Sequence, residues 1–385
     1  MGFFTGDLPD FPWDSLIPAR QRAAQYPGGA IDLTIGTPVD PVPAFIQAAL
    51  GGASDAHAYP ATIGSNELRT AIARWLHNHR GVTGTPGILP TIGSKEMVAL
   101  LPSFLGFGKG DTVAFPRMAY PTYDVGARIA GATPLPLNAD ADPETWPEGI
   151  ALLWLNSPGN PDGHVLGIHQ LKRIRAWARA HGTIIASDEC YAELTWDVPE
   201  APSILDTRVC GTDYRDIFCL YSLSKQSNMA GYRGAFIAGD PERIATLTQL
   251  RKHAGFMMPT PIQHAMAVAL GDEAHVTAQK ETYRLRREAL SGVLEAAGLR
   301  NDPKSVAGLY LWAEDASGRA NGWEIVNACA RIGIVVAPGD FYGEAARGRV
   351  RISLTATDEA IGEAIRRLPA LPGELRHAAA KPRER

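Results

Sequence analysis

Short runs of aliphatic residues alternate with helical patterns along this chain, and this alternation limits the fold more than any other feature. Strand patterns occur at 183–189 (TIIASDE), 217–222 (IFCLYS) and 234–239 (GAFIAG). Apolar residues spaced i, i+3 and i+4 predict amphipathic helices after Ser65 and before Gly182. Strands that alternate with helices favour an α/β fold built on a parallel sheet.

A second structural unit is expected after a long helical pattern at 273–297. The sequence that follows has strand patterns of its own at 308–313, 332–338 and 348–355. We interpret the long helix as the link into a smaller second domain. Its basic cluster, Arg284, Arg286 and Arg287, is typical of a solvated helix face rather than a binding patch.

Composition and spacing exclude several kinds of partner. The 37 Lys and Arg against 41 Asp and Glu give a net charge of −4 without a long block of one sign, which argues against nucleic acid. Nowhere do about 18 apolar residues follow one another, so a membrane helix is not predicted. The cysteines form no CxxC pair and no His or carboxylate cluster has metal spacing. We expect a cytoplasmic, metal-free protein with small-molecule partners.

The stretch from Ser222 to Gly234, SLSKQSNMAGYRG, carries the clearest chemistry. Lys225 follows a buried-strand pattern, where an ammonium group is costly unless its charge is lost or used. Such a lysine suits Schiff-base formation with an aldehyde, and hydroxyl groups beside Arg233 suit a phosphate. Taken alone, the stretch is equally typical of a surface lysine in a loop with a salt-bridged arginine.

The stretch also resembles a family signature. Class I/II pyridoxal-phosphate-dependent aminotransferases, of the aspartate aminotransferase fold (fold type I), carry S-x-S-K followed by G-x-R, matched here by Ser222, Ser224, Lys225, Gly231 and Arg233. Further family motifs follow the family order at 91–96 (TIGSKE), 156–161 (NSPGNP) and 187–191 (SDECY), and the likeness runs from 35–38 (IGTP) to 350–355 (VRISLT).

The resemblance implies an architecture. It is a three-layer αβα large domain with a mostly parallel sheet plus a smaller α+β domain, with pyridoxal 5'-phosphate as cofactor and a homodimer as the assembly. On this chain we expect residues 1–44 to form an N-terminal arm and part of the small domain. Residues 45–272 would form the large cofactor-binding domain, and 273–385 the linking helix and the small C-terminal domain.

Roles in catalysis come from the same resemblance. Lys225 would carry the cofactor and move the substrate's proton. Asp188, which ends an apolar strand pattern, would keep the pyridine nitrogen protonated. Asn160 and Tyr191 would hydrogen-bond the phenolic oxygen of the ring, and Tyr120 would stack on the ring. Tyr120 and Tyr191, taken alone, also fit a place in the core.

The resemblance further implies the groups that hold the phosphate and the substrate. Gly93, Ser94 and Lys95 begin a helix pattern, whose free backbone N–H groups favour a phosphate. Ser222, Ser224, Arg233 and Tyr59 of the neighbouring subunit would complete that site. The substrate would bind at Gly36, Asn160 and Arg351. Arg349 shares a strand face with Arg351 and stays a rival on spacing alone.

Longer stretches resemble one subgroup, the N-succinyldiaminopimelate aminotransferases of bacterial lysine and cell-wall synthesis; they include 8–16 (LPDFPWDSL), 251–261 (RKHAGFMMPTP) and 336–343 (VAPGDFYG). This likeness implies glutamate as donor, 2-oxoglutarate as its product and a succinylated amino-oxopimelate as acceptor. The alternatives are a class I/II aminotransferase of aspartate, aromatic or LL-diaminopimelate type, and a carbon–sulfur lyase of the same fold. Arg117 and Lys252 are candidates for the succinyl end, although surface positions are favoured for both.

Overall fold

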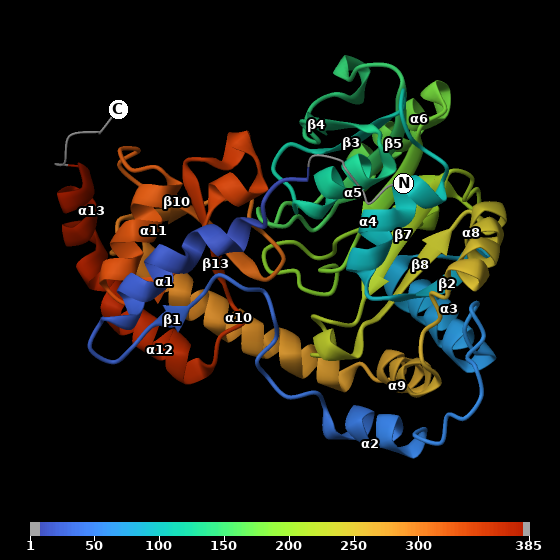
Figure 1. Ribbon diagram of the computed structural model, residues 1–385, viewed down its shortest axis with the longest axis horizontal. Helices are drawn as coiled ribbons and strands as arrows, with labels where there is room; N and C mark the ends of the chain where they lie inside the picture. The colour runs from blue at the N-terminus through green and yellow to red at the C-terminus, as the bar shows by residue number, and fades with distance from the viewer. Residues whose placement is uncertain (1–7, 380–385) are drawn as a thin grey trace, which may run out of the picture.

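A seven-stranded sheet, here called the large sheet, forms the core of one half of the computed structural model, which describes residues 8–379 (Figure 1, right). Residues 1–7, at the start of the first expected domain, and residues 380–385, at the end of the last, lie outside the described range. The strand order is β2–β8–β7–β6–β5–β3–β4. β8 runs antiparallel to both its neighbours and the other pairs are parallel. The strands are β2 (Gly87–Ile92), β3 (Thr112–Pro116), β4 (Thr133–Leu137), β5 (Ile150–Asn156), β6 (Ile184–Asp188), β7 (Ile217–Ser222) and β8 (Gly234–Gly239).

Helices cover both faces of the large sheet. Leu152 and Trp154 of β5 belong to the core beneath α4, α5 and α8, whereas Leu153 and Leu155 face the core beneath α3 and α6. Because successive side chains of a strand point to opposite faces, a strand buried on both sides reads as a continuous apolar run. The predicted α/β class with a mostly parallel sheet is thus confirmed. These helices are α2 (Ala44–Gly52), α3 (Asn66–Arg80), α4 (Ser94–Phe104), α5 (Thr122–Ala130), α6 (Ile168–His181), α7 (Thr207–Cys210), α8 (Pro241–Ala254) and α9 (Thr260–Leu270).

Local residues set the ends of the two predicted helices. The Ser65 hydroxyl accepts a hydrogen bond from the Leu68 N–H at 3.1 Å and so caps the start of α3. Gly81 after α3 and Gly182 after α6 adopt left-handed conformations, with φ of 65° and 66°. Glycine takes this conformation without the steric cost that a Cβ brings. α6 therefore ends at the predicted residue, and Gly81 ends α3, for which the sequence analysis named only the start.

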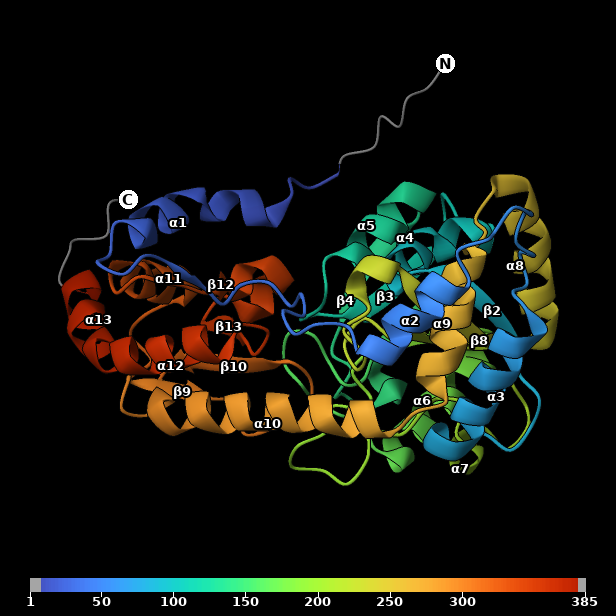
Figure 2. The same ribbon diagram turned by 90° about the horizontal axis from the view of Figure 1, so that it is seen from below.

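A four-stranded antiparallel sheet, here called the small sheet, lies beside the large one (Figure 2). The predicted strand at 332–338 is in fact divided. Its first half, residues 334–335, pairs with residues 31–32 of the N-terminal arm, and its second half, residues 337–338, pairs with residues 350–351 of the small sheet. The small sheet has the order β12 (Ala337–Pro338), β13 (Arg349–Ser353), β10 (Tyr310–Asp315) and β9 (Leu299–Asn301). β1 (Ile31–Asp32) and β11 (Ile334–Val335) form a separate parallel pair. The helices of this part are α1 (Ile17–Ala24), α10 (Ala274–Leu294), α11 (Gly322–Arg331), α12 (Asp358–Arg367) and α13 (Leu371–Ala379).

The long helix α10 runs along one side of the molecule and leads from the half that holds the large sheet to the small sheet (Figure 2). Its Arg284 is exposed and pairs with Glu281 on the same helix, as a solvated face predicts. For Arg286 that interpretation is wrong, because its side chain is only 4 % exposed and its guanidinium bonds Asp40 at 2.7 Å and Asp358 at 2.7 Å. Arg286 therefore ties the N-terminal arm and α12 to the long helix.

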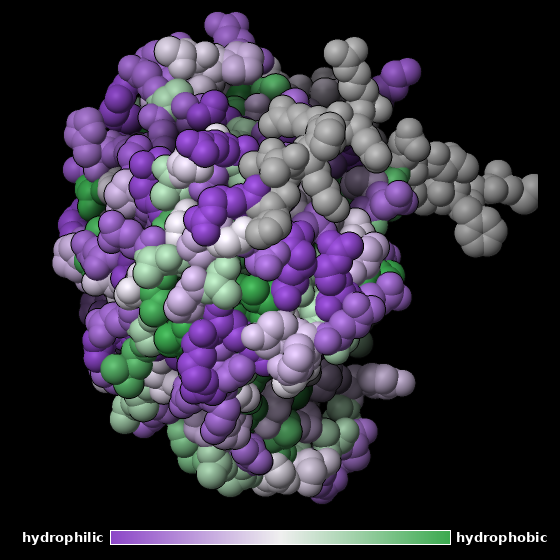
Figure 3. Space-filling model, turned by 90° about the vertical axis from the view of Figure 1, so that its left-hand side faces the viewer, coloured by the Kyte–Doolittle hydropathy of each residue, from purple (hydrophilic) through white to green (hydrophobic). Residues whose placement is uncertain are grey.

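The surface at the α13 end intersperses hydrophilic and hydrophobic side chains (Figure 3). No helix within residues 8–379 combines the length and the apolar character that spanning a membrane requires.

Substitution of the buried Arg80 should cost much of the protein's stability. Arg80 ends α3, and its Nη2 donates to Glu189 Oε2 at 2.7 Å where both side chains are shielded from water. Arg80→Met leaves that carboxylate buried and unpaired, so we expect the free energy of unfolding in urea to fall by about 3–5 kcal/mol. Arg284→Met, which removes an exposed ion pair, should change it by less than about 1 kcal/mol. Equal losses for both variants would contradict the argument.

Candidate active site

A cavity of about 810 Å³ lies where β5, β6 and β7 end, facing the small sheet. In open α/β sheets ligands bind outside the carboxyl ends of the strands, so this is the expected place for a site. The cavity brings together most of the residues that the sequence singled out: Gly36, Ser94, Lys95, Tyr120, Asn160, Asp188, Tyr191, Ser222, Ser224, Lys225, Arg233 and Arg351.

Lys225 lies three residues beyond the end of β7, and its Nζ donates to the Gly36 carbonyl. Burial lowers the pKa of Lys225, and the positive charges of Arg351 and Arg233 lower it further against an opposing effect of Tyr310. The side chain therefore loses its proton more readily than a free lysine. A neutral amine is the form that attacks a carbonyl or accepts a proton from carbon.

Asp188 is the last residue of β6 and is buried. Its Oδ2 accepts a hydrogen bond from the Tyr123 hydroxyl at 2.9 Å and its Oδ1 accepts one from the Cys190 N–H at 3.2 Å. Burial raises the pKa of Asp188 although both hydrogen bonds oppose the rise. A carboxylate in this position is well suited to bind a cationic ring N–H.

Tyr123 is a site residue that the sequence analysis missed. It lies in α5, three residues after Tyr120, and both side chains line the cavity. Tyr120 lies just before the N-cap Pro121, and its ring is 6.3 Å from that of Tyr123, so the nearness of a second tyrosine to Tyr120 in sequence was the available clue. Its full burial and its bond to Asp188 raise its pKa well above the ordinary value, so its hydroxyl stays a proton donor.

Arg351 of β13 reaches the cavity from the small sheet. Its Nη1 donates to Asn160 Oδ1 at 2.8 Å and its Nη2 donates to the Thr34 carbonyl at 2.6 Å. Its guanidinium lies over the Tyr310 ring at 3.9 Å, and its buried Nε has no hydrogen-bond partner among the described residues. A buried cation with a donor left over is ready to bind an anionic group.

The rival Arg349 lies elsewhere although it is on the same strand. Its guanidinium pairs with Asp302 at 3.2 Å and Glu314 at 3.1 Å and does not line the cavity. The two arginines are two residues apart on β13, as residues on one strand face are, but only Arg351 lines the cavity. Spacing alone could not separate them, because one partner of Arg349, Glu314, lies on the neighbouring strand β10 and the other, Asp302, lies in the connection between β9 and β10.

Tyr310 is a second missed residue. Its hydroxyl is 3.3 Å from that of Tyr191, and a Cβ at Gly36 would lie 2.0 Å from the Tyr310 oxygen. Burial alone raises the pKa of Tyr310, but Arg351 and Lys225 bring it below the ordinary value. Glycine at 36 therefore allows a polar cluster of Lys225, Tyr191 and Tyr310 to form.

One end of the cavity is suited to a phosphate. α4 begins at Ser94, directly after Gly93, which has a φ of 72°. A Cβ on Gly93 would lie 2.1 Å from Arg233 Nη2, so only glycine lets this guanidinium lie against the helix start. The Ser222 and Ser224 hydroxyl oxygens are 2.8 Å apart beside them. Free helix N–H groups, hydroxyls and a forked cation together match a phosphate.

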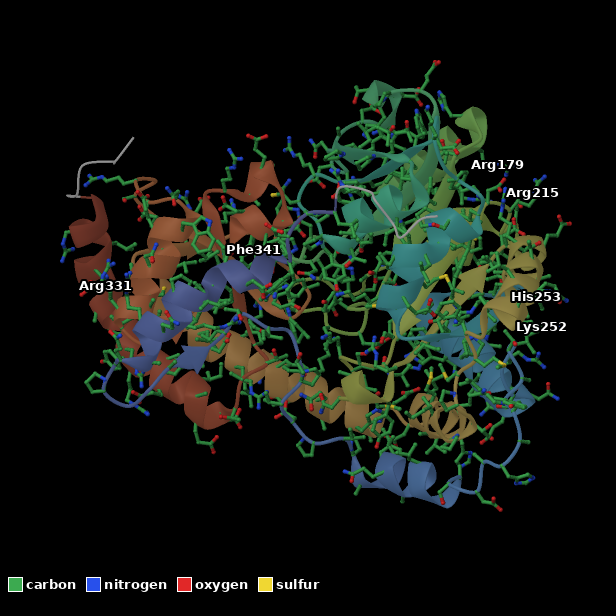
Figure 4. The ribbon with its side chains drawn as sticks, viewed as in Figure 1. Arg179, Arg215, Lys252, His253, Arg331 and Phe341 are labelled. Atoms are coloured by element: carbon green, nitrogen blue, oxygen red, sulfur yellow. The ribbon has the colours of Figure 1, made fainter. Side chains whose placement is uncertain are left out.

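Other predicted positions lie outside the cavity. Tyr59 is 95 % exposed and does not line it. Arg117 and Lys252, considered for a distal substrate group, do not line it either. Figure 4 shows Lys252 on α8 at the outer edge of the molecule, which agrees with the surface position favoured for it. By contrast, residues 8–14 of the N-terminal arm do line the cavity, and the sequence analysis gave them no role in the site.

The model of a known family, aminotransferase class I and II, matches residues 29–368. This chain belongs to that family. The aminotransferase is 48 % identical, over 94 % of its length and 99 % of the relative's, to the 4-dedimethylamino-4-oxo-anhydrotetracycline transaminase OxyQ of Streptomyces rimosus. It is 33 % identical, over 94 % of its length and 96 % of the relative's, to the LL-diaminopimelate aminotransferase of Aquifex aeolicus.

Solved structures agree with this assignment. An aminotransferase from Neisseria meningitidis is 29 % identical and superposes with a TM-score of 0.84, covering 95 % of this chain and 97 % of that one. The predicted fold, aminotransferase activity and pyridoxal-phosphate cofactor are thus confirmed. The residues fit this cofactor, since the cavity offers a phosphate site beside Gly93, a reactive lysine and a buried carboxylate.

The lowered pKa of Lys225 predicts how cofactor uptake depends on pH. Only the neutral amine attacks an aldehyde, so the rate at which cofactor-free enzyme takes up pyridoxal phosphate should rise with pH. It should level off at a lower pH than for N-acetyl-lysine, whose pKa is near the ordinary value of about 10.4. Stopped-flow absorbance between pH 6 and 10 measures both rates. A shared pH profile would contradict the prediction.

Proposed function

We propose that this aminotransferase is an N-succinyl-L,L-diaminopimelate:2-oxoglutarate aminotransferase of lysine and diaminopimelate biosynthesis, with glutamate as amino donor. The observation that carries the proposal is the size of the cavity. Its volume of about 810 Å³ is near the upper end of the range of about 300–1,000 Å³ for small-molecule sites and includes the place of the cofactor. Its lining continues beyond the residues that fit the cofactor to residues 8–14 of the N-terminal arm, which supports a substrate that extends past the cofactor. The likeness of whole stretches to the succinyldiaminopimelate subgroup and the LL-diaminopimelate aminotransferases among its relatives support it.

Residues of the cavity would hold the cofactor in two groups. Ser94, Ser222, Ser224, Arg233 and the N-terminus of α4 would hold its phosphate. The ring would lie between Asp188, Tyr191, Asn160 and Tyr120. When bound, pyridoxal phosphate supplies an aldehyde for the amino group and a ring that draws electrons from the substrate's α-carbon.

Lys225 and Arg351 would then act on the substrate itself. Arg351 holds the α-carboxylate with donors that its present partners leave unused, and this fixes the α-carbon toward the lysine. Lys225 takes the proton from the α-carbon as a neutral amine and later returns it. Asp188 keeps a positive charge on the ring nitrogen favourable, because a buried carboxylate without a cation is costly.

Lys95 is our candidate for the succinyl carboxylate. Its side chain is exposed at the cavity, and within residues 8–379 it has no ion-pair partner. Its Nζ is 5.8 Å from the centre of the Tyr120 ring and 6.0 Å from that of Phe11. An ammonium group in this place can meet an anion that enters beyond the cofactor.

A different acceptor, a fused-ring ketone, is the second candidate. The relative at 48 % identity is named for such a substrate, and the outer part of the cavity is lined by apolar residues of the N-terminal arm. These surfaces suit a flat apolar skeleton at least as well as a flexible chain.

A substrate panel tests the proposal. Purified enzyme receives glutamate with either the succinylated amino-oxopimelate or a fused-ring ketone as acceptor, and 2-oxoglutarate with LL-diaminopimelate, aspartate or an aromatic amino acid as donor. Cystathionine is supplied alone, and the products of each reaction are measured. The highest kcat/KM for the succinylated compound supports the proposal. Preference for another acceptor overturns the specific substrate, and release of pyruvate from cystathionine would instead indicate the lyase.

We also propose that the enzyme acts as a homodimer in which Tyr59 reaches the phosphate of the neighbouring subunit. The supporting observation is that this tyrosine is 95 % exposed, far more than a core aromatic would be. Light scattering of the purified holoenzyme should give a mass near 83 kDa, roughly twice that of one chain. A monomer of 41.3 kDa with full activity would overturn the assembly.

A further inference from the structure

The N-terminal arm supplies a wall of the cavity that the reaction chemistry leaves without a role. All residues from Leu8 to Asp14 line the cavity together with Ile35. Leu8, Phe11 and Ile35 are large apolar side chains that stay exposed, Phe11 to 58 %. Exposed apolar side chains gathered at the mouth of a site, rather than scattered singly, indicate a surface that a ligand covers.

Trp13 packs against two aromatic residues that lie next to the small sheet. Its ring packs at 5.2 Å from that of Phe341 and at 6.4 Å from that of Tyr342. Figure 4 shows Phe341 beside the N-terminal helix. Tyr342 in turn lies 5.0 Å from the guanidinium of Arg351. The Trp13 indole therefore contacts Tyr342, which itself lies beside Arg351, the candidate carboxylate-binding residue.

Phe11 continues this wall toward the large sheet. Its ring is 5.5 Å from that of Trp13 and 6.0 Å from Lys95 Nζ. Figure 2 shows the chain before α1 leaving the small sheet in the direction of α4 and α5. Phe11 and Trp13 thus bridge the space between Arg351 on one side and Lys95 on the other.

We propose that Phe11 and Trp13 are specificity-determining residues that favour acceptors with an extended apolar portion beyond the α-carbon. This inference rests on the proposed function, because it concerns the acceptor half of that reaction. Glutamate and 2-oxoglutarate are short and end in a carboxylate, so they gain little from two aromatic rings at the mouth. A longer acceptor covers the rings and removes their apolar surface from water.

The experiment compares Phe11→Ala and Trp13→Ala with Phe45→Ala, which truncates an exposed phenylalanine of α2 outside the cavity. Acceptors are 2-oxoglutarate, 2-oxohexanoate, 2-oxodecanoate, phenylpyruvate and the succinylated amino-oxopimelate. For both cavity variants we expect kcat/KM for the long acceptors to fall by about 10-fold or more, within the range of about 10–200-fold for losing apolar contact in a pocket. The values for 2-oxoglutarate and for Phe45→Ala should stay within about threefold of the parent.

Two results would overturn the inference. One is an equal loss for short and long acceptors, which would indicate a general structural effect. The other is unchanged selectivity in Phe11→Ala, whose exposed ring can be removed without opening the core. Thermal unfolding of each holoenzyme variant checks that Trp13→Ala remains folded, and Phe11→Ala decides the matter if it does not.

The acceptor series also separates this inference from the proposed function. If the succinylated compound is not a substrate but the dependence on chain length disappears in Phe11→Ala, the proposed substrate is wrong and the specificity wall stands. If the succinylated compound reacts equally well with all variants, the proposed substrate stands and the wall is wrong.

Discussion

Lys225→Ala is expected to abolish transamination, with kcat reduced by about 10⁴-fold or more. Lys225 is the lysine of the cavity whose pKa is lowered by burial, and in the proposed reaction it would both attach the cofactor and transfer the proton at the α-carbon. Without this lysine the site keeps groups that bind the cofactor and the substrate but lacks the amine that would move the proton. Single-turnover rates with glutamate measure the reaction, and borohydride reduction followed by mass spectrometry shows whether pyridoxal phosphate still becomes fixed to the chain.

Lys252→Ala is the matched control for this variant. It removes a lysine at the outer edge of α8, outside the cavity, and should leave both the rate and the cofactor attachment at the parent values. Normal turnover by Lys225→Ala, or fixation of the cofactor to another residue of that variant, would show that the assignment of this lysine is wrong.

Arg351→Lys should lower kcat/KM for glutamate by about 10²-fold. A lysine keeps the positive charge but lacks the planar fork that binds a carboxylate through two parallel hydrogen bonds. It also loses the stacking of the guanidinium over Tyr310 and the bond to Asn160. Steady-state kinetics with glutamate as the varied substrate should show the loss mainly as a higher KM, because the carboxylate is bound both before and during the reaction.

Arg349→Lys tests the same chemistry two residues away on the same strand. Its guanidinium pairs with Asp302 and Glu314 outside the cavity, so its replacement should leave KM for glutamate within about twofold. A large rise in KM for Arg349→Lys with none for Arg351→Lys would reverse the assignment of the two arginines.

Three adjacent strands of the large sheet, β6, β7 and β8, could be predicted from the chain because they are apolar and buried on both faces and turn residues bound them. The patterns at 217–222 and 234–239 coincide with β7 and β8. Lys225 was recognisable for the same reason, since a cation next to such a strand needs a chemical explanation. The motif residues that the cavity brings together come from segments whose local sequence is distinctive.

What could not be predicted depends on contacts between distant segments. The strand pattern at 332–338 is continuous in sequence, yet its two halves have partners 303 residues before it and 14 residues after it. Tyr123 and Tyr310 read as ordinary core aromatics, because their hydroxyl partners Asp188 and Tyr191 lie far along the chain. Arg286 was interpreted as a solvated residue because its partners, Asp40 and Asp358, lie far from it in the sequence.

The hydrogen bond between Arg351 and the Thr34 carbonyl joins residues 317 positions apart, and this has a consequence for biosynthesis. Lys225 and Asp188 emerge from the ribosome well before β13, so the residues around the cofactor can assemble while the chain is still being made. The proposed substrate-binding group, Arg351, reaches its place only after β13 has been made and has packed against the N-terminal arm, which is synthesised first. The substrate-binding site is therefore completed later in synthesis than the set of residues proposed to hold the cofactor.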